Sequence, residues 1–384
     1  MGRPDRTSEE TGGWALVIND TDLKMDNFSR RDFLKVSLLG LGAVALSRQP
    51  IMRRIMTEFP QGNKLGRAFY SVDIKAKPDM DSATVKSIYE DTVVEWNREV
   101  IGTAPSLYST NRRWVETTEG YIPYIHLQPV KNNINVPLTA LPQQQTEAGF
   151  WAEITIPYID ASLDVPAKTP KIEGQTTARF VYSQIYWVDQ IKQSDDGTTL
   201  YRFYEKHGGY GDLFWADARA FRPITAEELS PINPGVAEKK IVVDLTHQTL
   251  SCFEGTQEVL FTRVSTGARD LQGNFVENWA TPVGDYHVIN RKYISLHMAG
   301  GTSASGYEEF SVCWTSIFAT NGVALHSTYW HNNFGEPMSH GCVNLLPDDA
   351  KFIYRWSLPT PPYQEGVIEQ SGYDGTAVQI KAEP

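Results

Sequence analysis

Short segments in which apolar and polar residues alternate begin after residue 60. In the range 66–78 the sequence GRAFYSVDIKAKP alternates in this way and stops at Pro78, and the ranges 85–96 and 112–130 are further β-prone runs. Alternation with a period of two predicts strands that have one buried face and one exposed face. Strands this short, broken by turn residues, favour a small β-barrel, which we place at residues 61–132.

Residues 133–235 change character along their length. Stretches rich in Pro, Gln and Thr up to residue 178 predict a connector, interrupted by the strand-like run FWAEITIPYI at 150–159. From 179 to 224 we expect a hairpin around Asp196-Gly197, within either a second, divergent β-barrel or a β extension packed on the following domain. A short helix and then a Pro/Gly linker are expected at 225–235, where the next domain boundary lies.

Residues 236–384 are again rich in predicted strands and contain little predicted helix. The strands are expected in KKIVVDLTHQTLSCFEG (239–255, two strands around a turn at 246–248), EVLFTRVSTG (258–267), ATPVGDYHVINRKY (280–293), GVALHST (322–328) and TAVQI (376–380). A helix is expected at 346–357, where Pro347 and two aspartates suit a first helical turn. The predicted fold class is therefore mainly β, with one or two small modules before a larger β domain.

The first 60 residues have the layout of an export signal and a linker. The basic run SRRDFLK at 29–35 precedes eleven uncharged apolar residues at 36–46, too few to cross a bilayer as one helix. The pair Arg30-Arg31 followed by Phe-Leu-Lys resembles a twin-arginine signal. The alternative is a buried helix with a basic cap, and Met25 is a candidate for the natural start. We expect export to the cell wall or a periplasm-like space, with membrane contact only through this segment if it stays uncleaved.

Charge and cysteine content narrow the possible functions. The 384 residues carry a formal net charge of −11, and no basic run follows the N-terminal one, which argues against nucleic-acid binding. Three cysteines are an odd number, so at least one thiol stays unpaired within the chain. In an exported protein an unpaired thiol therefore indicates a functional role for that cysteine.

One of these cysteines, Cys342, lies in a segment with the components of a nucleophilic site. It follows Ser339-His340-Gly341, and His326, His331 and His340 fall within fifteen residues of one another. A cysteine nucleophile needs a neighbouring base and donors for an oxyanion. His326, at the end of a predicted strand, can supply the base, and glycine lets backbone approach a substrate closely.

Three other interpretations compete on spacing alone. The three histidines and Cys342 are possible zinc ligands, although their spacing fits no known zinc site and only one ligand is soft. A buried structural cysteine is common, but it would leave the histidines and the glycine unexplained. A disulfide to Cys252 or Cys313 is possible in an oxidising compartment.

The run HSTYWHNNFGEPMSHGCVNLL at 326–346 closely resembles the signature of L,D-transpeptidases with a YkuD-type catalytic domain. The turn ATPVGDY at 280–286 and the hairpin at 239–255 are similar to earlier parts of that domain. Likewise, VDIKAKP at 72–78, Trp114-Val115 and Gly120-Tyr121-Ile122 resemble bacterial Src-homology-3-like domains. The resemblance implies a β-sandwich-like catalytic domain with a short helix over 236–384.

The resemblance also implies a role for each matching residue. Cys342 would be the nucleophile and His326 its base, with the Ser327 carbonyl orienting the His326 ring. The remaining expected roles are oxyanion-hole N–H groups at His340, Gly341 and Cys342, a site-shaping His340 side chain, and substrate contacts from Asn344 and Trp330. His331 has no place in the general signature and stays unassigned.

The implied reaction joins peptidoglycan stem peptides by 3→3 cross-links through a cysteine thioester. Hydrolysis of the same stems by an L,D-carboxypeptidase is the alternative within the enzyme class, and a non-catalytic wall-binding protein is the alternative outside it. Donor and acceptor stems are the expected partners, and a carbapenem is expected to acylate Cys342. No metal and no organic cofactor is expected, because nucleophilic acyl transfer needs neither.

Overall fold

The fold is taken from a computed structural model, which describes residues 59–106, 109–143, 147–268, 279–300, 306–372 and 374–382. The expected export signal and the alternative start at Met25 lie outside these residues. All described residues belong to one compact unit, Met52–Pro384. Within them, no helix is both long and apolar enough to cross a membrane.

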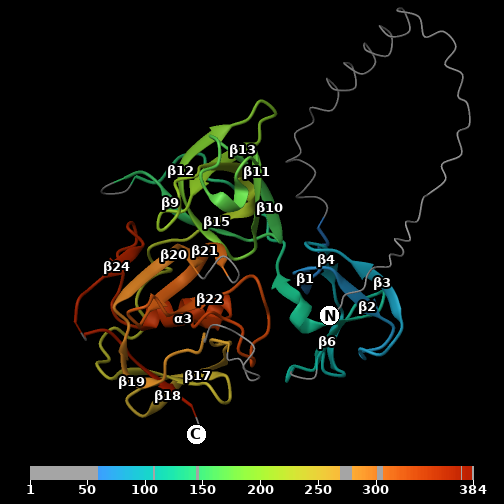
Figure 1. The fold of residues 1–384 in the computed structure, drawn as a ribbon. Helices are drawn as coiled ribbons and strands as arrows, with labels where there is room; N and C mark the ends of the chain where they lie inside the picture. Colours follow the sequence, from blue (N-terminus) through green and yellow to red (C-terminus); the bar gives the residue numbers. More distant parts are fainter. Residues whose placement is uncertain are drawn as a thin grey trace, which may run out of the picture. The chain divides into compact units, whose positions relative to one another are not determined.

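The first β module consists of two small sheets (Figure 1). The three-stranded sheet has the order β4-β1-β8 and the five-stranded sheet the order β3-β2-β7-β6-β5. The strands are β1 (Leu65–Ala68), β2 (Val72–Lys75), β3 (Thr84–Ile88), β4 (Val93–Glu95), β5 (Arg98–Ile101), β6 (Arg113–Glu116), β7 (Tyr121–Pro123) and β8 (Leu127–Val130). Trp114, Val115 and Ile122 are fully buried, so the module has a core of its own. The expected short strands are present, and the likeness to Src-homology-3 domains stays a prediction.

The second β module is one antiparallel sheet of seven strands, in the order β11-β10-β14-β13-β12-β9-β15. The strands are β9 (Phe150–Ile154), β10 (Tyr158–Leu163), β11 (Thr177–Val181), β12 (Ile185–Gln193), β13 (Thr199–Tyr204), β14 (Phe214–Asp217) and β15 (Phe221–Pro223). The expected hairpin around Asp196-Gly197 joins β12 and β13. By contrast, the supposed connector up to residue 178 contributes β9, β10 and the start of β11, so it is more ordered than its composition indicates.

The short helix expected at 225–235 is absent. Leu229 and Ser230 donate backbone hydrogen bonds to residues three positions earlier, which makes turns and not an α-helix. Only seven residues separate Pro223 from Pro231, and neither proline can donate a backbone hydrogen bond. The segment is therefore too short to repay the cost of nucleating a helix.

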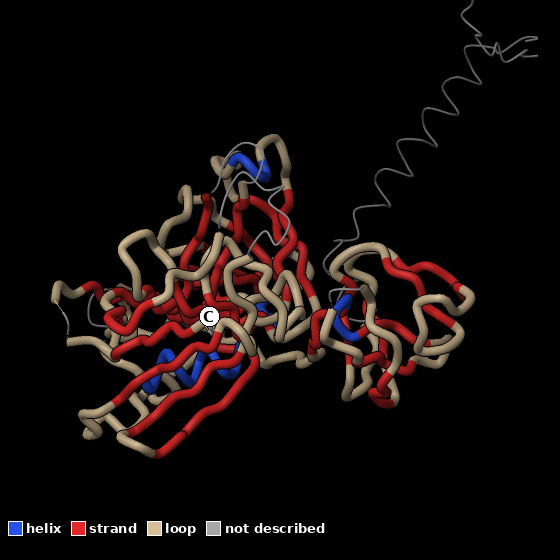
Figure 2. The backbone as a smooth tube through the Cα atoms, turned by 60° about the horizontal axis from the view of Figure 1, so that its bottom comes forward, coloured by secondary structure: helices blue, strands red, loops and turns tan. Residues whose placement is uncertain are grey.

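The third part, from β16 onward, contains two five-stranded sheets with a helix between them (Figure 1; Figure 2). One sheet has the order β18-β17-β16-β25-β19 and the other β23-β22-β21-β20-β24. The elements are β16 (Lys239–Asp244), β17 (Thr249–Glu254), β18 (Gln257–Arg263), β19 (Gly284–Val288), β20 (Arg291–Gly300), β21 (Tyr307–Ile317), β22 (Ala324–Ser327), β23 (Val343–Leu345), α3 (Pro347–Trp356), β24 (Val367–Glu369) and β25 (Ala377–Lys381). The expected helix is thus α3, the α-helix of the described part of the chain.

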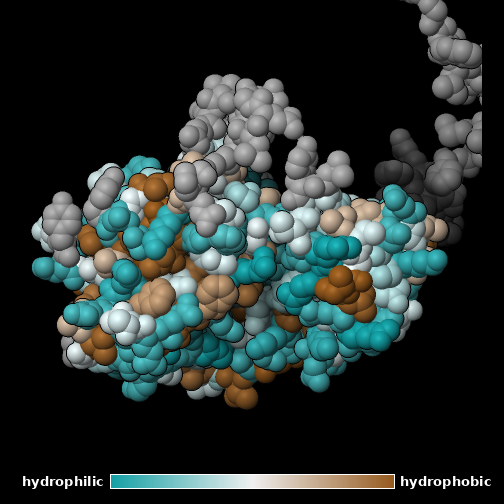
Figure 3. Space-filling view, turned by 90° about the horizontal axis from the view of Figure 1, so that it is seen from below, coloured by the Kyte–Doolittle hydropathy of each residue, from teal (hydrophilic) through white to brown (hydrophobic). Residues whose placement is uncertain are grey.

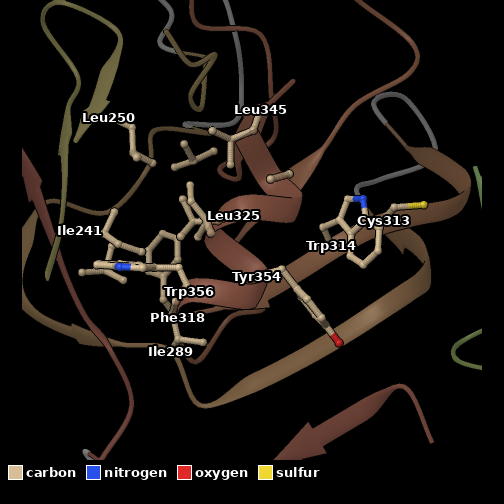
Figure 4. Packing of buried hydrophobic residues seen from close by; sticks show 14 of the residues in the cluster. Ile241, Leu250, Ile289, Cys313, Trp314, Phe318, Leu325, Leu345, Tyr354 and Trp356 are labelled. Atoms are coloured by element: carbon tan, nitrogen blue, oxygen red, sulfur yellow. The ribbon is translucent and has the colours of Figure 1, made fainter. Parts of the chain in front are cut away.

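One hydrophobic core joins the two sheets to the helix. Ile241 and Leu250 come from the first sheet, Leu325 and Leu345 from the second, and Trp356 from α3 (Figure 4). The helix also bonds to the first sheet, because Trp356 Nε1 donates to Glu254 Oε1 at 2.7 Å. This packing fixes the ends of β22 and β23, from which the candidate site is built.

The second module is tied directly to this domain. Ser311 on β21 accepts a hydrogen bond from the Ile185 N–H and donates one to the Ile185 carbonyl, both at 2.8 Å. Trp151 and Trp187 of the second module are buried in the same core as α3. The sheet of the second module and the sheet containing β21 are therefore packed together and do not form independent bodies.

The face in Figure 3 is mostly hydrophilic, with hydrophobic residues in small separate groups. Exposed large apolar side chains include Tyr89, Ile101, Val136 and Phe261, which lie on different modules or strands. Scattered apolar residues of this kind are normal for a folded surface and do not by themselves mark an interface.

Candidate active site

The candidate site forms where two neighbouring strands run parallel. His326 on β22 lies opposite Asn344 on β23, and Leu325 lies opposite Val343. Cys342 directly precedes β23, so the parallel register brings it to the same sheet edge as His326. Both side chains line one cavity of about 230 Å³. The expected pairing of these two residues in one site is therefore present.

The cavity also contains residues that the sequence pattern did not single out. Trp330, Ser339, His340 and Asn344 were expected near the site and line it. The further lining residues are Met298, Tyr307, Glu309, Val312 and Met338. Met298 lies on β20, and Tyr307, Glu309 and Val312 lie on β21, so a strand pair remote from the Ser-His-Gly-Cys run supplies one wall.

Hydrogen bonding fixes the tautomer of His326. Its ring is buried, and Nδ1 lies 2.9 Å from the Ser327 carbonyl oxygen. A carbonyl can only accept, so Nδ1 carries the hydrogen and Nε2 keeps its lone pair. Burial lowers the pKa of His326 to about 4, although the bond to Ser327 opposes this shift. The imidazole is therefore a neutral acceptor at physiological pH.

The Cys342 thiol differs from the other two. Cys342 is half-buried, whereas Cys252 and Cys313 are buried, and none of the three forms a disulfide. Burial raises the pKa of Cys342 to about 11, and a hydrogen bond from the Ala324 backbone partly opposes the shift. At neutral pH this pair is thus a neutral thiol and a neutral imidazole. The alternative of a disulfide from Cys342 to Cys252 or Cys313 is wrong.

The turn before Cys342 is held by a network of short hydrogen bonds. Gly341 has φ +124°, in the left-handed region that favours glycine. Its carbonyl accepts from Thr281 Oγ1 at 2.8 Å, and Thr281 Oγ1 in turn accepts from Gly267 N–H at 2.9 Å. Ser339 Oγ donates to the Cys342 carbonyl at 2.5 Å. Thr281, the threonine of the ATPVGDY turn, is therefore a support of the nucleophile turn that went unassigned in the sequence.

One expected oxyanion-hole donor is engaged elsewhere. The Gly341 N–H donates to Ser339 Oγ at 3.1 Å, because the serine side chain closes the turn on itself. The expectation that the Gly341 N–H points to the substrate is therefore wrong for this conformation. The N–H groups of His340 and Cys342 remain the candidates for that role.

The His340 ring is packed between two aromatic side chains. Its centroid lies 4.2 Å from that of Trp279 and 4.8 Å from that of Tyr307. This position shapes the cavity wall, as expected of the side chain. Within the described residues no three His, Cys, Asp or Glu side chains come together as a metal site would require. The zinc interpretation of the three histidines and Cys342 therefore has no geometric support.

His331, left unassigned by the sequence, contacts Asn344. Its side chain is half-buried, desolvation lowers its pKa to about 3, and Nε2 lies 2.7 Å from the Asn344 side-chain amide. The Asn333 N–H donates to His331 Nδ1 at 3.2 Å, so in this neutral ring Nε2 must carry the hydrogen.

The tautomer of His331 orients the Asn344 amide. A hydrogen on Nε2 requires an acceptor, and a half-turn of the amide brings Oδ1 to this position. Without that half-turn, Oδ1 is buried and has no hydrogen-bond partner among the described residues. In that orientation Oδ1 accepts from His331, and the NH₂ group takes the buried place that Oδ1 held. Asn344 lines the cavity, and its expected contact with a substrate stays a prediction.

The Trp330 ring lies beside the ring of His326. Its ring centroid is 5.8 Å from that of His326, with the ring planes inclined by 34°. Trp330 is half-buried and lines the cavity, so its indole can limit access of water to His326 and contact a bound peptide. The expected substrate-contacting position of Trp330 is present, and its contribution to binding stays a prediction.

Comparison with known protein families identifies the part of the chain that holds this site. Residues 238–380 match the family model of the L,D-transpeptidase catalytic domain, YkuD. This part of the chain is thus similar to YkuD-type L,D-transpeptidase catalytic domains, and the predicted mainly β fold class is confirmed. A comparison with curated proteins gave no significant match.

Solved structures are also similar to the chain. An L,D-transpeptidase from Stackebrandtia nassauensis is 27% identical, with 41% of this chain and 60% of that chain covered and a TM-score of 0.25. The Enterococcus faecium L,D-transpeptidase, as a cysteine-to-serine mutant, is 21% identical over 38% of this chain and 51% of that chain, with a TM-score of 0.28. An L,D-transpeptidase from Mycobacterium smegmatis is 15% identical over 75% of this chain and 99% of that chain, with a TM-score of 0.30. The match thus spans little more than half the length of the first two structures.

Proposed function

We propose that this protein is an exported cell-wall L,D-transpeptidase that forms 3→3 peptidoglycan cross-links through a thioester on Cys342. The observation that carries the proposal is the tautomer of His326. Its Nδ1–H is bound to the Ser327 carbonyl, which leaves the Nε2 lone pair in the cavity that also holds Cys342. A thiol beside an oriented base is the arrangement that acyl transfer requires. The family match of residues 238–380 supplies the substrate class.

In the first half-reaction Cys342 attacks the carbonyl of the third, diamino-acid residue of a donor stem. The sulfur–carbon bond forms as the thiol proton moves to His326 Nε2, because neither group is ionised beforehand. Backbone N–H groups of His340 and Cys342 stabilise the oxyanion. The carbon–nitrogen bond to the terminal D-alanine then breaks, and His326 returns the proton to the leaving amine.

In the second half-reaction the side-chain amine of an acceptor stem attacks the thioester. The new carbon–nitrogen bond forms, the carbon–sulfur bond breaks, and a proton returns to the Cys342 sulfur. Water in place of the amine would give hydrolysis and an L,D-carboxypeptidase. Asn344 and the Trp330 ring border the cavity, where they can hold the peptide during both steps.

A β-lactam carbonyl would enter the same pathway. Attack of Cys342 opens the lactam ring and leaves a stable acyl-enzyme, so incubation with a carbapenem should add the full mass of the drug to the protein. The neutral resting thiol makes this reaction dependent on His326. Cys342→Ala should remove the adduct and His326→Ala should slow it, whereas Cys252→Ala leaves the cavity thiol intact and should still be labelled.

The test of the proposed function is a muropeptide assay with the purified protein, read by mass spectrometry. Tetrapeptide stems should give dimers with a 3→3 bond and free D-alanine, and Cys342→Ala should give neither. Trimmed monomers without dimers would establish hydrolysis in place of transfer. Intact substrate with the wild-type protein, or dimers with Cys342→Ala, would refute the proposal.

A further inference from the structure

One acidic side chain faces the cavity of Cys342 without a place in the acylation chemistry. Glu309 on β21 is the single Asp or Glu among the described residues that line this cavity. The remaining lining side chains are apolar, aromatic or neutral polar groups. Glu309 thus lines the same cavity as Cys342.

Hydrogen bonding leaves the Glu309 carboxylate partly unsatisfied. Tyr329 Oη donates to Oε2 at 2.9 Å, and no described group donates to Oε1. The side chain is 21% exposed, so water compensates it only in part, and burial raises its pKa. A carboxylate can accept about four hydrogen bonds, and leaving them unmade in a partly buried place is unfavourable. The site is therefore prepared for a donor that the protein itself does not supply.

The nearest cation does not fill this place. Lys171, from the second module, lies 3.9 Å from Glu309 Oε2. Its ammonium group instead donates to the backbone carbonyl of Glu308 at 2.6 Å. Lys171 therefore attracts the Glu309 carboxylate without forming a hydrogen bond to it, and Oε1 stays open to another cation.

Glu309 also borders a second cavity of about 320 Å³, which Trp330 and Tyr329 line as well. Residues of the first and second modules line it, and most of its charges are already paired. Asp91 binds Arg67 at 2.5 Å and Arg179 at 2.8 Å. Glu309 and Trp330 line both cavities, so they stand at the junction between them.

We propose that Glu309 binds the ammonium group of the acceptor stem, whose peptide lies in the second cavity and meets the thioester at the junction. This inference rests on the proposed function, since it names the residue that selects the second substrate. An alkylammonium group carries three N–H donors, which can occupy Oε1 and share Oε2 with Tyr329. The donor stem occupies the cavity of Cys342 at this stage, so the acceptor has to approach from elsewhere. Glu309 acts in substrate binding only. Before attack the ammonium gives one proton to the neutral His326 Nε2, and the amine formed in this way attacks the thioester. The proton on His326 then moves to the departing Cys342 sulfur, and the second proton lost by the nitrogen goes to solvent.

The test separates the two half-reactions in the full-length chain. Acylation is followed by D-alanine release and by intact mass, and transfer is followed by dimer formation as the concentration of an acceptor stem with a free side-chain amine is varied. Glu309→Gln keeps the size and removes the charge. It should raise the acceptor concentration for half-maximal transfer about tenfold or more, as expected for loss of a hydrogen bond to a charged group. The acylation rate should stay within about twofold of wild type.

A second variant tests the same proposal, because it should change the half-maximal acceptor concentration in the opposite direction. Lys171→Gln removes the competing ammonium from a half-exposed side chain, so it should lower the half-maximal acceptor concentration. Glu173→Gln, an exposed glutamate two positions further along, is the matched control and should alter neither half-reaction. An equal loss of acylation and transfer in Glu309→Gln, or an unchanged acceptor dependence in both variants, would overturn the proposal.

A failure of the proposed function is distinguishable from a failure of this inference. If the wild-type protein forms no dimers, the proposed function fails at that control. The inference is then tested by calorimetric binding of an amine-bearing stem to Cys342→Ala with and without Glu309→Gln. Equal affinities in these two proteins would refute it, and a loss of about tenfold on removing the carboxylate would support it.

Discussion

The imidazole Nε2 of His331 lies 2.7 Å from the side-chain amide of Asn344, and the two side chains form one unit behind the cavity wall. The Asn333 N–H fixes the tautomer of His331, and that tautomer determines which end of the Asn344 amide faces the His331 ring. His331 thus acts through Asn344 as a positioning residue. This relationship gives a role to the histidine that the family signature does not require.

Replacing His331 by Ala should lower kcat/KM for acylation about tenfold, because the Asn344 amide loses the partner that orients it. His331→Gln, whose side-chain N–H can still donate to Asn344 Oδ1, should recover part of the loss. Thermal unfolding of the same variants separates positioning from folding, since a purely structural role would lower Tm without this selective recovery. The exposed His247→Ala is the control, and activity equal to wild type in His331→Ala would contradict the assignment.

The acylation rate should be nearly independent of pH across the neutral range. The pKa of His326 is lowered to about 4 and that of Cys342 is raised to about 11, so both groups keep one protonation state between these values. On the acid side the rate should fall as His326 gains a proton near pH 4 and can no longer accept one from the thiol. A stopped-flow profile of carbapenem acylation measures this, and an acid limb near the ordinary histidine pKa would contradict it.

Alkylation by iodoacetamide provides an independent check of the thiol. Only the thiolate reacts readily, and its fraction at neutral pH is small because burial raises the pKa of Cys342. Alkylation of Cys342 should therefore be slow at pH 7 and accelerate steadily toward alkaline pH. Peptide mapping distinguishes Cys342 from the buried Cys252 and Cys313. Rapid alkylation at pH 6 would indicate a preformed thiolate–imidazolium pair.

Thr281→Val should impair the site because it removes the hydroxyl that joins Gly267 N–H to the Gly341 carbonyl. Both partners are buried backbone groups, and leaving them unsatisfied should cost about 1–3 kcal/mol of stability each. The turn before Cys342 loses the hydrogen bonds that hold it in place. Acylation should therefore slow by more than the change in Tm explains. The exposed Thr118→Val is the control for the substitution itself. An acylation rate of Thr281→Val equal to that of the wild type would show that the turn does not depend on these hydrogen bonds.

Lys292 offers a test of stability away from the cavity. It is fully buried, and its ammonium donates to the carbonyls of Tyr354 and Ser357 at the end of α3. Lys292→Met removes both bonds and should lower the free energy of unfolding by about 2–4 kcal/mol. Denaturant unfolding measures the change, and the exposed Lys240→Met should have little effect.

The pH dependence of stability adds a second readout for Lys292. Burial holds its pKa well below the ordinary lysine value, so the unfolded chain binds this proton more readily than the folded one. Stability should therefore rise with pH between the folded and unfolded pKa values. Lys292→Met should flatten this rise, and an unchanged slope would contradict a buried titrating ammonium.

The sequence was informative where the site depends on local pattern. His326 and Cys342 are 16 residues apart, yet the parallel pairing of β22 and β23 brings them together, and the resemblance anticipated this. The helix α3 was also predicted, because its initial proline, the two aspartates of its first turn and its apolar face are each typical of a helix. Predicting these features requires little knowledge of distant parts of the chain.

The opposite wall of the cavity was out of reach for sequence reasoning. Tyr307 and Glu309 lie on β21, whose last eight residues are all buried, so the strand lacks the alternation that would indicate it. Positive φ angles at Ser311 and Trp314 interrupt its regular pleat as well. In the second module the run at 150–159 was expected as one strand within a connector, whereas it holds β9 and the start of β10, separated by residues 155–157. In both places tertiary packing decides the structure, and short-range pattern does not.

The two hydrogen bonds between Ser311 and Ile185 bear on where the enzyme can be divided. Ser311 lies two residues after Glu309 on the strand that forms the cavity wall, and its side chain is satisfied by the second module. Trp151 of that module also donates to the Tyr363 carbonyl at 2.8 Å. A fragment that begins at residue 236 would lack Ile185, which bonds to Ser311 beside the cavity wall, and Trp151 and Trp187, which fill part of the shared core. The smallest autonomous catalyst should accordingly begin near residue 147, well upstream of the family boundary.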